Sequence, residues 1–267
     1  MKGKFSLKIG NFSAYSTAFE TVPENLAVNH CHDSYEILYV IKGTGKYIVE
    51  GSDFEVRPRT LMLFRPFAYH HVCIDESGGY ERFVIHFPKS IVPSQALSML
   101  EKIAGDDEMS GSYYPPAAIP ETLLSAFDRL EVAAALPEEE KIAYVKTLLA
   151  EIIILLSASK GELMLNTDEE LGARVIRYLN GNIDRDINLD KLAKRFFVSK
   201  YHLCRAFKKH NGISIHGYLV QKRIIYAKQL IESGETASGA AYKVGFGDYS
   251  AFYRAYVKIV GKAPTAD

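Results

Sequence analysis

Residues 188–212, NLDKLAKRFFVSKYHLCRAFKKHNG, decide the fold of the C-terminal part of the chain. Apolar residues recur at helical spacing from Leu189 to Phe196, which predicts a short helix with one apolar face. The pattern breaks at Val198, and Ser199 is a favoured N-cap for a second helix. Two short helices across a tight break predict a helix-turn-helix unit, whose second helix enters the major groove of DNA.

The second predicted helix separates apolar from polar residues. Its inward side is expected to carry Leu203, Ala206 and Phe207. Residues at i, i+4 and i+7 share the opposite side. That side carries Tyr201, Arg205 and Lys208, with Cys204 beside them. An aromatic residue and basic residues on one exposed face are suited to contact with a nucleic acid.

The same pattern returns near the C-terminus. Residues 205–212, RAFKKHNG, are matched by residues 254–261, RAYVKIVG, so that arginine, aromatic residue, lysine and glycine keep their offsets. Two copies about fifty residues apart form an internal repeat, which is stronger evidence than one copy. The alternative is an ordinary helical bundle with solvated charges.

Between Leu171 and Pro264 the chain resembles the AraC-type transcription regulators. The resemblance is carried by LAKRFFVSKYHLCRAFKKHNGISI at 192–215, RIIYAKQL at 223–230, KVGFGDYSAFYR at 243–254 and GKAP at 261–264. One departure lies at residues 236–241, TASGAA, where the family usually has isoleucines. Gly239 inside a helix costs about 1 kcal/mol relative to alanine, so the second unit is expected to be less stable or more closely packed.

The resemblance implies two DNA-reading helices joined by a rigid helix at 215–233, which should enter successive major grooves about one turn apart. The candidates for contact with base edges are Tyr201, Cys204, Arg205, Tyr249, Ser250, Tyr253 and Arg254. Arginine can bind guanine O6 and N7 in a bidentate manner, whereas tyrosine and cysteine favour apolar contacts. The candidates for contact with phosphate are Lys200, Lys208, Lys209 and Lys258.

Charge is divided between the two parts of the chain. The formal net charge is zero, but residues 171–267 hold 17 Lys and Arg against 7 Asp and Glu. A basic C-terminal part suits phosphate binding, because neutralised phosphates release counterions. The remaining residues carry a matching acidic excess, so we expect them to lie away from DNA.

Composition also favours a cytoplasmic protein. No apolar run is long enough to span a bilayer, and the N-terminus lacks the apolar core of a secretory signal. The three cysteines have no framework spacing and are expected to be free thiols. We therefore expect no contact with a membrane.

The N-terminal part up to about Pro88 is predicted to be β structure. Several short strands at regular spacing, including Tyr35–Ile41, indicate an antiparallel barrel or jelly roll. The detail resembles a cupin: residues 30–36, HCHDSYE, are followed after six residues by Gly43, and residues 65–71 read RPFAYHH, with alanine where glycine is usual. The resemblance implies a sensor domain for a small effector.

Four residues are the candidates for effector binding: His30, His32, Glu36 and His71. His30 and His32 alternate along an expected strand, so they point to one face and could meet the other two. Three alternatives are open: an organic effector bound without metal, hydrogen bonding only, or a divalent transition metal. Arg57, Arg65 and Arg82 could pair with an anionic ligand, although exposed charges are more often solvated.

The middle of the chain is predicted to be helical, with residues 105–116 as an irregular loop. Helices are expected at 94–103, 120–136 and 137–159. The last has a broad apolar stripe formed by Ile142, Val145, Leu148, Leu149, Ile152, Ile153 and Leu156. A small barrel would cover only part of this stripe, so we expect a homodimer, with packing inside one chain as the alternative. Thr167 is expected to cap the helix that opens the DNA-binding domain.

The sequence thus predicts an α+β multidomain chain. Residues 1–93 form a cupin-like antiparallel β-barrel, 94–160 a helical dimerisation segment, 161–168 a linker, and 169–267 an all-α domain with two helix-turn-helix units. The expected partners are double-stranded promoter DNA, a small-molecule effector such as a sugar, a second copy of the chain, and RNA polymerase if the protein is an activator. We expect no catalytic residue and no cofactor. The alternatives are a metal-dependent cupin enzyme with a helical appendage and an architectural DNA-binding protein with an inert barrel.

Overall fold

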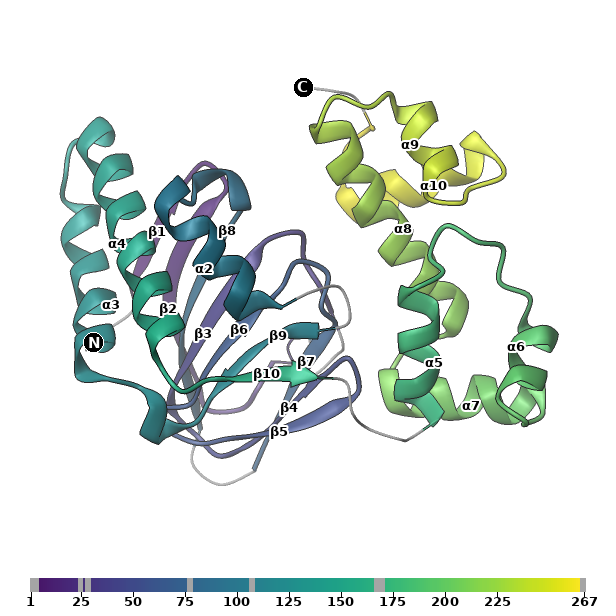
Figure 1. Ribbon diagram of the computed structural model, residues 1–267, viewed down its shortest axis with the longest axis horizontal. Helices are drawn as coiled ribbons and strands as arrows, with labels where there is room; N and C mark the ends of the chain where they lie inside the picture. The colour runs from purple at the N-terminus through teal and green to yellow at the C-terminus, as the bar shows by residue number, and fades with distance from the viewer. Residues whose placement is uncertain are drawn as a thin grey trace. The chain divides into compact units, whose positions relative to one another are not determined.

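In a computed structural model of the protein, the described residues are 5–23, 26, 30–75, 79–105, 109–165 and 171–264. The chain divides into two compact units, residues 1–166 and residues 167–267 (Figure 1). The first contains the β structure and the second is helical, as the sequence predicted. No described helix is both long and apolar enough to cross a bilayer.

The described strands of the first unit form two antiparallel sheets. The larger sheet has the order β1 (Ser6–Ile9), β2 (Phe12–Phe19), β8 (Tyr80–Phe87), β3 (Tyr35–Lys42), β6 (Leu61–Phe64), β9 (Met109–Tyr114) and β10 (Glu162–Leu165). The smaller sheet has the order β5 (Ser52–Val56), β4 (Gly45–Val49) and β7 (His70–Ile74). Long sequence separations between neighbours such as β2 and β8 give the jelly-roll connectivity that the strand spacing indicated.

The larger sheet is buried on both faces, because successive side chains of a strand point to opposite sides. On β8, Phe83, Ile85 and Phe87 join an apolar core with helices of the same unit. Tyr80 and Val84 alternate with them and join a second core with residues of the smaller sheet. Arg82 and His86 share that second face by the same alternation. The polar residues of interest therefore lie between the two sheets.

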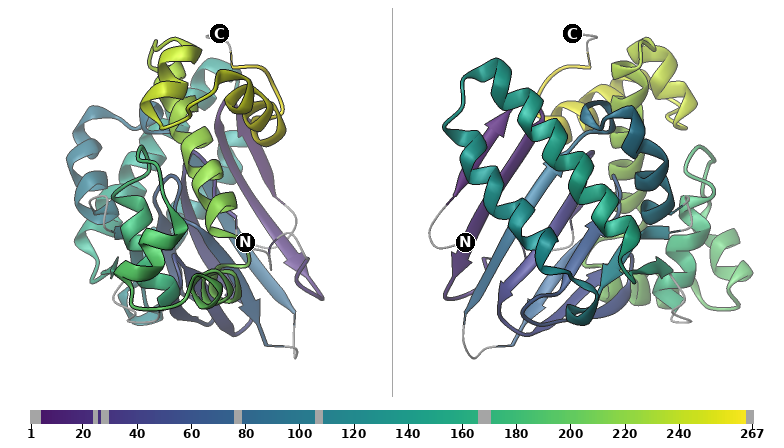
Figure 2. Two further views of the ribbon diagram at one scale, coloured as in Figure 1. Left: turned by 90° about the vertical axis from the view of Figure 1, so that its right-hand side faces the viewer. Right: turned by 60° about the vertical axis from the view of Figure 1, so that its left-hand side comes forward.

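Three helices cover the outer face of the larger sheet (Figure 2). They are α2 (Ser94–Ala104), α3 (Glu121–Ala134) and α4 (Glu138–Ala158), with short 3₁₀ turns η1 (Lys89–Ile91) and η2 (Pro116–Ala118) between elements. Of the predicted apolar stripe on α4, Ile142 is 39% exposed, and the other six residues are buried inside the chain. The expectation that one small barrel leaves much of this stripe uncovered is therefore wrong.

Two strands occupy segments for which no strand was predicted. Strand β9 lies in the predicted loop 105–116, and β10 lies in the predicted linker 161–168. They pair with each other, and β9 pairs with β6, so the segment after residue 93 completes the sheet of the first unit. The predicted N-cap Thr167 lies outside the described residues, and the first described helix of the second unit begins at Leu171.

The described part of the second unit consists of helices α5 (Leu171–Asn180), α6 (Leu189–Arg195), α7 (Lys200–Asn211), α8 (Ile215–Glu232), α9 (Ala237–Lys243) and α10 (Tyr249–Val260). Helix α8 packs against α7 and against α9 and α10, so it joins the two helix-turn-helix units. Arg223 of α8 strengthens this junction. Its Nε donates to the carbonyl oxygen of Ile183 at 2.8 Å and an Nη donates to that of Arg185 at 2.6 Å, both between α5 and α6.

Candidate nucleic-acid interface and sensor site

Helices α7 and α10 have matching ends, which explains why the sequence repeat keeps its offsets. The Ser199 side chain caps α7 by accepting from the backbone N–H of His202 at 3.1 Å. The Asp248 carboxylate caps α10 by accepting from the N–H of Ala251 at 2.8 Å. Both helices end at a left-handed glycine, Gly212 and Gly261. The two helices have the same length of 12 residues, so their side chains can be compared position by position.

Each helix buries one side and exposes the side that the sequence predicted. Leu203 and Phe207 are buried on α7, and Phe252 and Tyr256 are buried on α10. Of the candidates for base contact, Tyr201 is 75% exposed and Cys204 is half-buried. The remaining candidates are all exposed: Arg205, Tyr249, Ser250, Tyr253 and Arg254. The two arginines therefore occupy equivalent places on the exposed surfaces of two equivalent helices.

The lysine candidates for phosphate contact lie at both ends of the helices. Lys208 and Lys209 are exposed in the last turn of α7, and Lys258 is exposed in the last turn of α10. Lys200, at the start of α7, forms an ion pair with Asp190 of α6 at 3.1 Å. Because Lys200 already has an acidic partner, it would contribute less to phosphate binding than the other three lysines.

Two exposed aromatic residues in the same unit were not predicted from the sequence. Phe197, in the turn between α6 and α7, is 93% exposed, and Tyr242 of α9 is also largely exposed. Phe197 also has a positive φ of 56°. An aromatic residue after an amphipathic helix is ordinarily placed in the core, so the sequence contains no local signal for this exposure.

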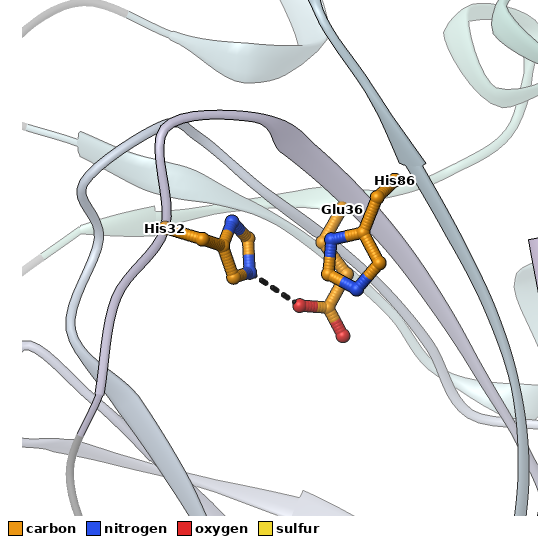
Figure 3. A group of neighbouring side chains, drawn as sticks. All are labelled: His32, Glu36 and His86. Carbon is orange, nitrogen blue, oxygen red and sulfur yellow. Dashed lines mark hydrogen bonds and ion pairs between the residues drawn. The ribbon is translucent and has the colours of Figure 1, made fainter. Parts of the chain in front are cut away.

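A cluster of histidines surrounds Glu36 between the two sheets of the first unit. Figure 3 shows His32 directed at the Glu36 carboxylate. The His32 Nε2 lies 2.6 Å from the Glu36 Oε2. The His32 Nδ1 donates a hydrogen bond to the carbonyl oxygen of Ser34 at 2.9 Å. This bond fixes the ring so that Nε2 faces the carboxylate. The predicted meeting of His32 and Glu36 is therefore present.

His70, and not His71, is the β7 residue that reaches this cluster. The Nε2 of His70 lies 3.4 Å from the Glu36 Oε2, and its Nδ1 donates to the carbonyl oxygen of Ala68 at 2.9 Å. The His30 ring contacts the His70 ring with centroids 4.6 Å apart. Since adjacent residues of a strand point to opposite sides, His71 faces away from the cluster. The expectation that His71 would meet Glu36 is wrong by one residue of strand register.

His86 of β8 is a further member that the sequence reasoning missed. Its ring lies against the His32 ring, with centroids 4.7 Å apart, and its Nε2 is 3.2 Å from the Tyr15 hydroxyl. His86 is opposite Glu36 in the pairing of β3 with β8. Only the pairing of strands brings these distant residues together, so no spacing in the sequence could have identified His86.

Burial and hydrogen bonding set the protonation states of the cluster. Burial opposes ionisation of Glu36, but the hydrogen bond from His32 and the neighbouring histidines outweigh it and hold the pKa of Glu36 well below 4.5. Burial likewise opposes the charged form of His32, but its bond to Glu36 raises the pKa above 6.5. Burial lowers the pKa of His70 to about 4. At neutral pH, Glu36 is therefore ionised and His70 neutral.

The cluster has donor atoms suited to a transition metal. One ligand atom from each of His32, Glu36 and His86 can be chosen so that all three lie within 4.8 Å of one another. Imidazole nitrogen and carboxylate oxygen are ordinary ligands of such ions. The same atoms also satisfy one another by hydrogen bonding, so this geometry is compatible with a site without metal.

The three arginines that could meet an anion have different environments. Arg57 is exposed and Arg65 is half-buried, whereas Arg82 is only 6% exposed and lies between the sheets. Its Nη1 donates to the Tyr47 hydroxyl at 3.2 Å, and that hydroxyl lies 2.9 Å from the Tyr80 hydroxyl. Only Arg82 is therefore in the interior where a sensor domain of this fold would hold a ligand.

Comparison with protein families matches both units. Residues 17–153 match the model of the AraC-like ligand binding domain, and residues 192–266 match a helix-turn-helix domain. The chain is 29% identical over 233 residues to the HTH-type transcriptional regulator YbfI of Bacillus subtilis, covering 83% of this chain and 80% of that protein. It is 24% identical over 237 residues to the transcriptional activator RhaS of Enterobacter sp., covering 86% and 84%.

A solved structure of ToxT from Vibrio cholerae is also similar. It is 12% identical in sequence, covers 96% of both chains and has a TM-score of 0.39. The relatives named are transcription regulators rather than enzymes. The ligand-binding model covers half of the chain, and the helix-turn-helix model covers most of the second unit. The chain therefore belongs to the AraC family of DNA-binding transcription regulators, with an N-terminal ligand-binding domain.

Proposed function

We propose that α7 and α10 read an operator from successive major grooves on one side of the DNA. Arg205 and Arg254 would bind guanine edges, with Tyr201, Cys204, Tyr249, Ser250 and Tyr253 making the neighbouring base contacts. Lys208, Lys209 and Lys258, with a smaller contribution from Lys200, would bind phosphates and position the helices. The observation that carries the proposal is the repeated arrangement: two capped helices of equal length expose an arginine at the same place.

An unbiased DNA selection with the full-length protein tests this proposal. The expected product is a bipartite site whose two conserved halves are separated by about one helical turn. A single short half-site would show that only one helix reads sequence. Recovery of no enriched sequence would contradict specific reading by either helix.

The salt dependence of DNA binding tests the role of the lysines. Four phosphate contacts per chain predict that log K falls against log salt with a slope of roughly −3 to −4. The measurement is a fluorescence anisotropy titration with a fixed operator over a range of salt concentrations. Substituting Lys208 by glutamine should reduce the slope by about one, whereas substituting the ion-paired Lys200 should reduce it less. A flat response would contradict electrostatic positioning.

We further propose that a small molecule bound between the sheets of the sensor domain controls this DNA binding. His30, His32 and Glu36 are retained as candidate contacts, and His70 and His86 replace His71 because they face the cluster. Replacing His32 by asparagine and Glu36 by glutamine together should abolish the ligand response and leave operator affinity unchanged. A thermal-shift screen of small molecules, sugars included, followed by DNA titration with each binder, measures both effects.

A bound transition metal is the second candidate at this site, because three donor atoms converge there. Elemental analysis of the purified protein separates the two possibilities. Stoichiometric metal that is lost in the His86→Ala variant would support a metal centre. Absence of metal, together with an organic binder, would support the effector site.

We also propose two protein partners, a second copy of the chain and RNA polymerase. A homodimer would place two pairs of reading helices on one operator, and exposed Ile142, Ile154 and Val132 on α3 and α4 offer apolar surface for it. RNA polymerase would be a partner if the protein activates transcription, and a cytoplasmic location follows from both roles. Light scattering of the full-length protein with and without operator measures the dimer directly.

A further inference from the structure

The inner face of the larger sheet carries polar atoms without hydrogen-bond partners. Arg82 is 6% exposed, and its Nε is buried and has no partner among the residues that the structure describes. Thr17 is directly opposite Arg82 in the pairing of β2 with β8, and its Oγ1 is likewise buried without a described partner. Partners across an antiparallel pair share a face and lie about 5 Å apart at Cβ, so the two side chains are neighbours on the inner face.

No described carboxylate forms an ion pair with Arg82, although Glu36 interacts with it electrostatically from a greater distance. Glu36 is the nearby acid, but its Oε2 is already bonded to His32 at 2.6 Å and lies 3.4 Å from His70. Of the described residues, none places a carboxylate within salt-bridge distance of Arg82, whose hydrogen-bond acceptor is the neutral Tyr47 hydroxyl. Burying a guanidinium without a paired anion is costly, so the arrangement calls for a negatively charged partner.

The surroundings of Arg82 define the rest of that partner. The second core, around the same inner face, is built from apolar and aromatic residues, including Met62, Phe64 and Val84. A ligand lying there would meet these apolar side chains as well as the polar atoms already described. A guanidinium without an ion-pair partner among the described residues matches a single negative charge, and its fork of N–H donors matches the two oxygens of a carboxylate.

We propose that the sensor domain binds an organic monocarboxylate with an apolar body, whose carboxylate accepts hydrogen bonds from Arg82 and from the Thr17 hydroxyl. This rests on the proposed function of the domain as a small-molecule sensor and specifies the class of effector. The ligand carboxylate would occupy the acceptor position that Arg82 Nε lacks in the protein.

The test uses matched acids and amides on the full-length protein. The probes are benzoate, 4-phenylbutyrate and octanoate, each paired with its primary amide, at millimolar concentration in thermal-shift and calorimetric titrations. At least one acid should raise the melting temperature while its amide does not, because the amide lacks the charge that Arg82 pairs with. Equal binding of acid and amide, or no binding by any of the three acids, overturns the inference.

Variants then locate the bound carboxylate. Arg82→Met should weaken binding of the active acid by about tenfold or more, and Thr17→Val by less, because Arg82 pairs a full charge with the carboxylate whereas Thr17 donates from an uncharged hydroxyl. Arg57→Met removes an exposed charge from the same domain and should leave binding unchanged. If Arg82→Met fails to fold, Thr17→Val, which keeps the side-chain shape, decides the location. If the variants at both positions bind the active acid with unchanged affinity, the proposed carboxylate site is overturned.

The outcome also separates this inference from the proposed function. If neutral molecules such as sugars bind and alter operator affinity while the acids do not, the sensor function stands and the anion inference fails. If the acids bind with the expected dependence on Arg82 but leave operator affinity unchanged, the site is real and control of DNA binding fails.

Discussion

The two helix-turn-helix units use the same backbone turn but fill it with different residues. In the first unit, Phe197 follows α6 with φ of 56°; in the second, Gly245 follows α9 with φ of 87°. The hydrogen bonds around the two turns correspond, because Val198 and Phe246 each donate to a carbonyl oxygen five residues earlier, at 3.0 Å. The turn therefore requires a left-handed residue in both copies, although only one copy has a glycine.

The neighbours of each turn explain the difference. A Cβ on Gly245 would clash with the backbone carbonyl of Asp184, whose carbon would lie only 2.8 Å away, and would come within 3.1 Å of the Arg223 guanidinium. Phe197 is almost fully exposed, so no segment crowds its backbone in the same way. Glycine is required where another segment of backbone approaches, whereas the left-handed conformation alone is tolerated at a smaller cost.

A substitution at Gly245 is expected to have the largest effect on stability. Gly245→Ala should destabilise the second unit by roughly 2–4 kcal/mol, because it combines an unfavourable φ with a backbone clash at the Asp184 carbonyl. Hydrogen-exchange mass spectrometry should show loss of protection in α9 and α10, with loss also between α5 and α6, where Arg223 binds. Gly247→Ala is the matched control, since a Cβ there has no atom within 4 Å. Equal loss in both variants would contradict the clash.

An intermediate effect is expected from the equivalent arginines of the two recognition helices. Arg205→Ala and Arg254→Ala should each weaken operator binding by roughly 1–3 kcal/mol and relax specificity in one half of the site. The effects should add within about 0.5 kcal/mol if the two helices read separate base pairs. Operator titrations with each half-site mutated in turn measure this, and Arg57→Ala controls for the lost charge. If both variants relax specificity in the same half-site, the two-groove arrangement is contradicted.

The helix-turn-helix units were predictable from the sequence because their determinants are local. Caps at Ser199 and Asp248, helical periodicity and the terminal glycines all act within a few residues. The expectation that the small residues at 236–241 make the second unit less stable or more closely packed stays a prediction, but the surroundings of Gly239 give a reason for glycine at that position. A Cβ at Gly239 would lie against the side chains of Glu235 and Thr236, so the small residue leaves room for the capping interactions of α9.

The sensor site was less predictable because it depends on strand pairing. His32 and Glu36 are close in sequence and were found, whereas His86 reaches them only because β8 pairs with β3. His70 and His71 could not be told apart without the orientation of β7, and a shift of one residue reverses which of them faces inward. The strands β9 and β10 were missed for the same reason, since the pairing that stabilises them joins residues about fifty positions apart in the chain.

The smallest effect is expected at Phe197, where the comparison of the two turns predicts that glycine increases the stability of the first unit. Phe197→Gly removes the cost of a side chain at positive φ, about 1–2 kcal/mol, and adds about 0.5–1 kcal/mol of unfolded-state entropy, so the first unit should gain up to about 1.5 kcal/mol. Phe197→Ala removes the ring but keeps the Cβ, so it should give no such gain. Hydrogen exchange of α6 and α7 compares the two variants.

If alanine stabilises α6 and α7 as much as glycine does, the cost lies in exposing the ring rather than in the backbone. Operator titration of the same two variants tests the ring itself, because a contact between Phe197 and DNA would weaken binding in both.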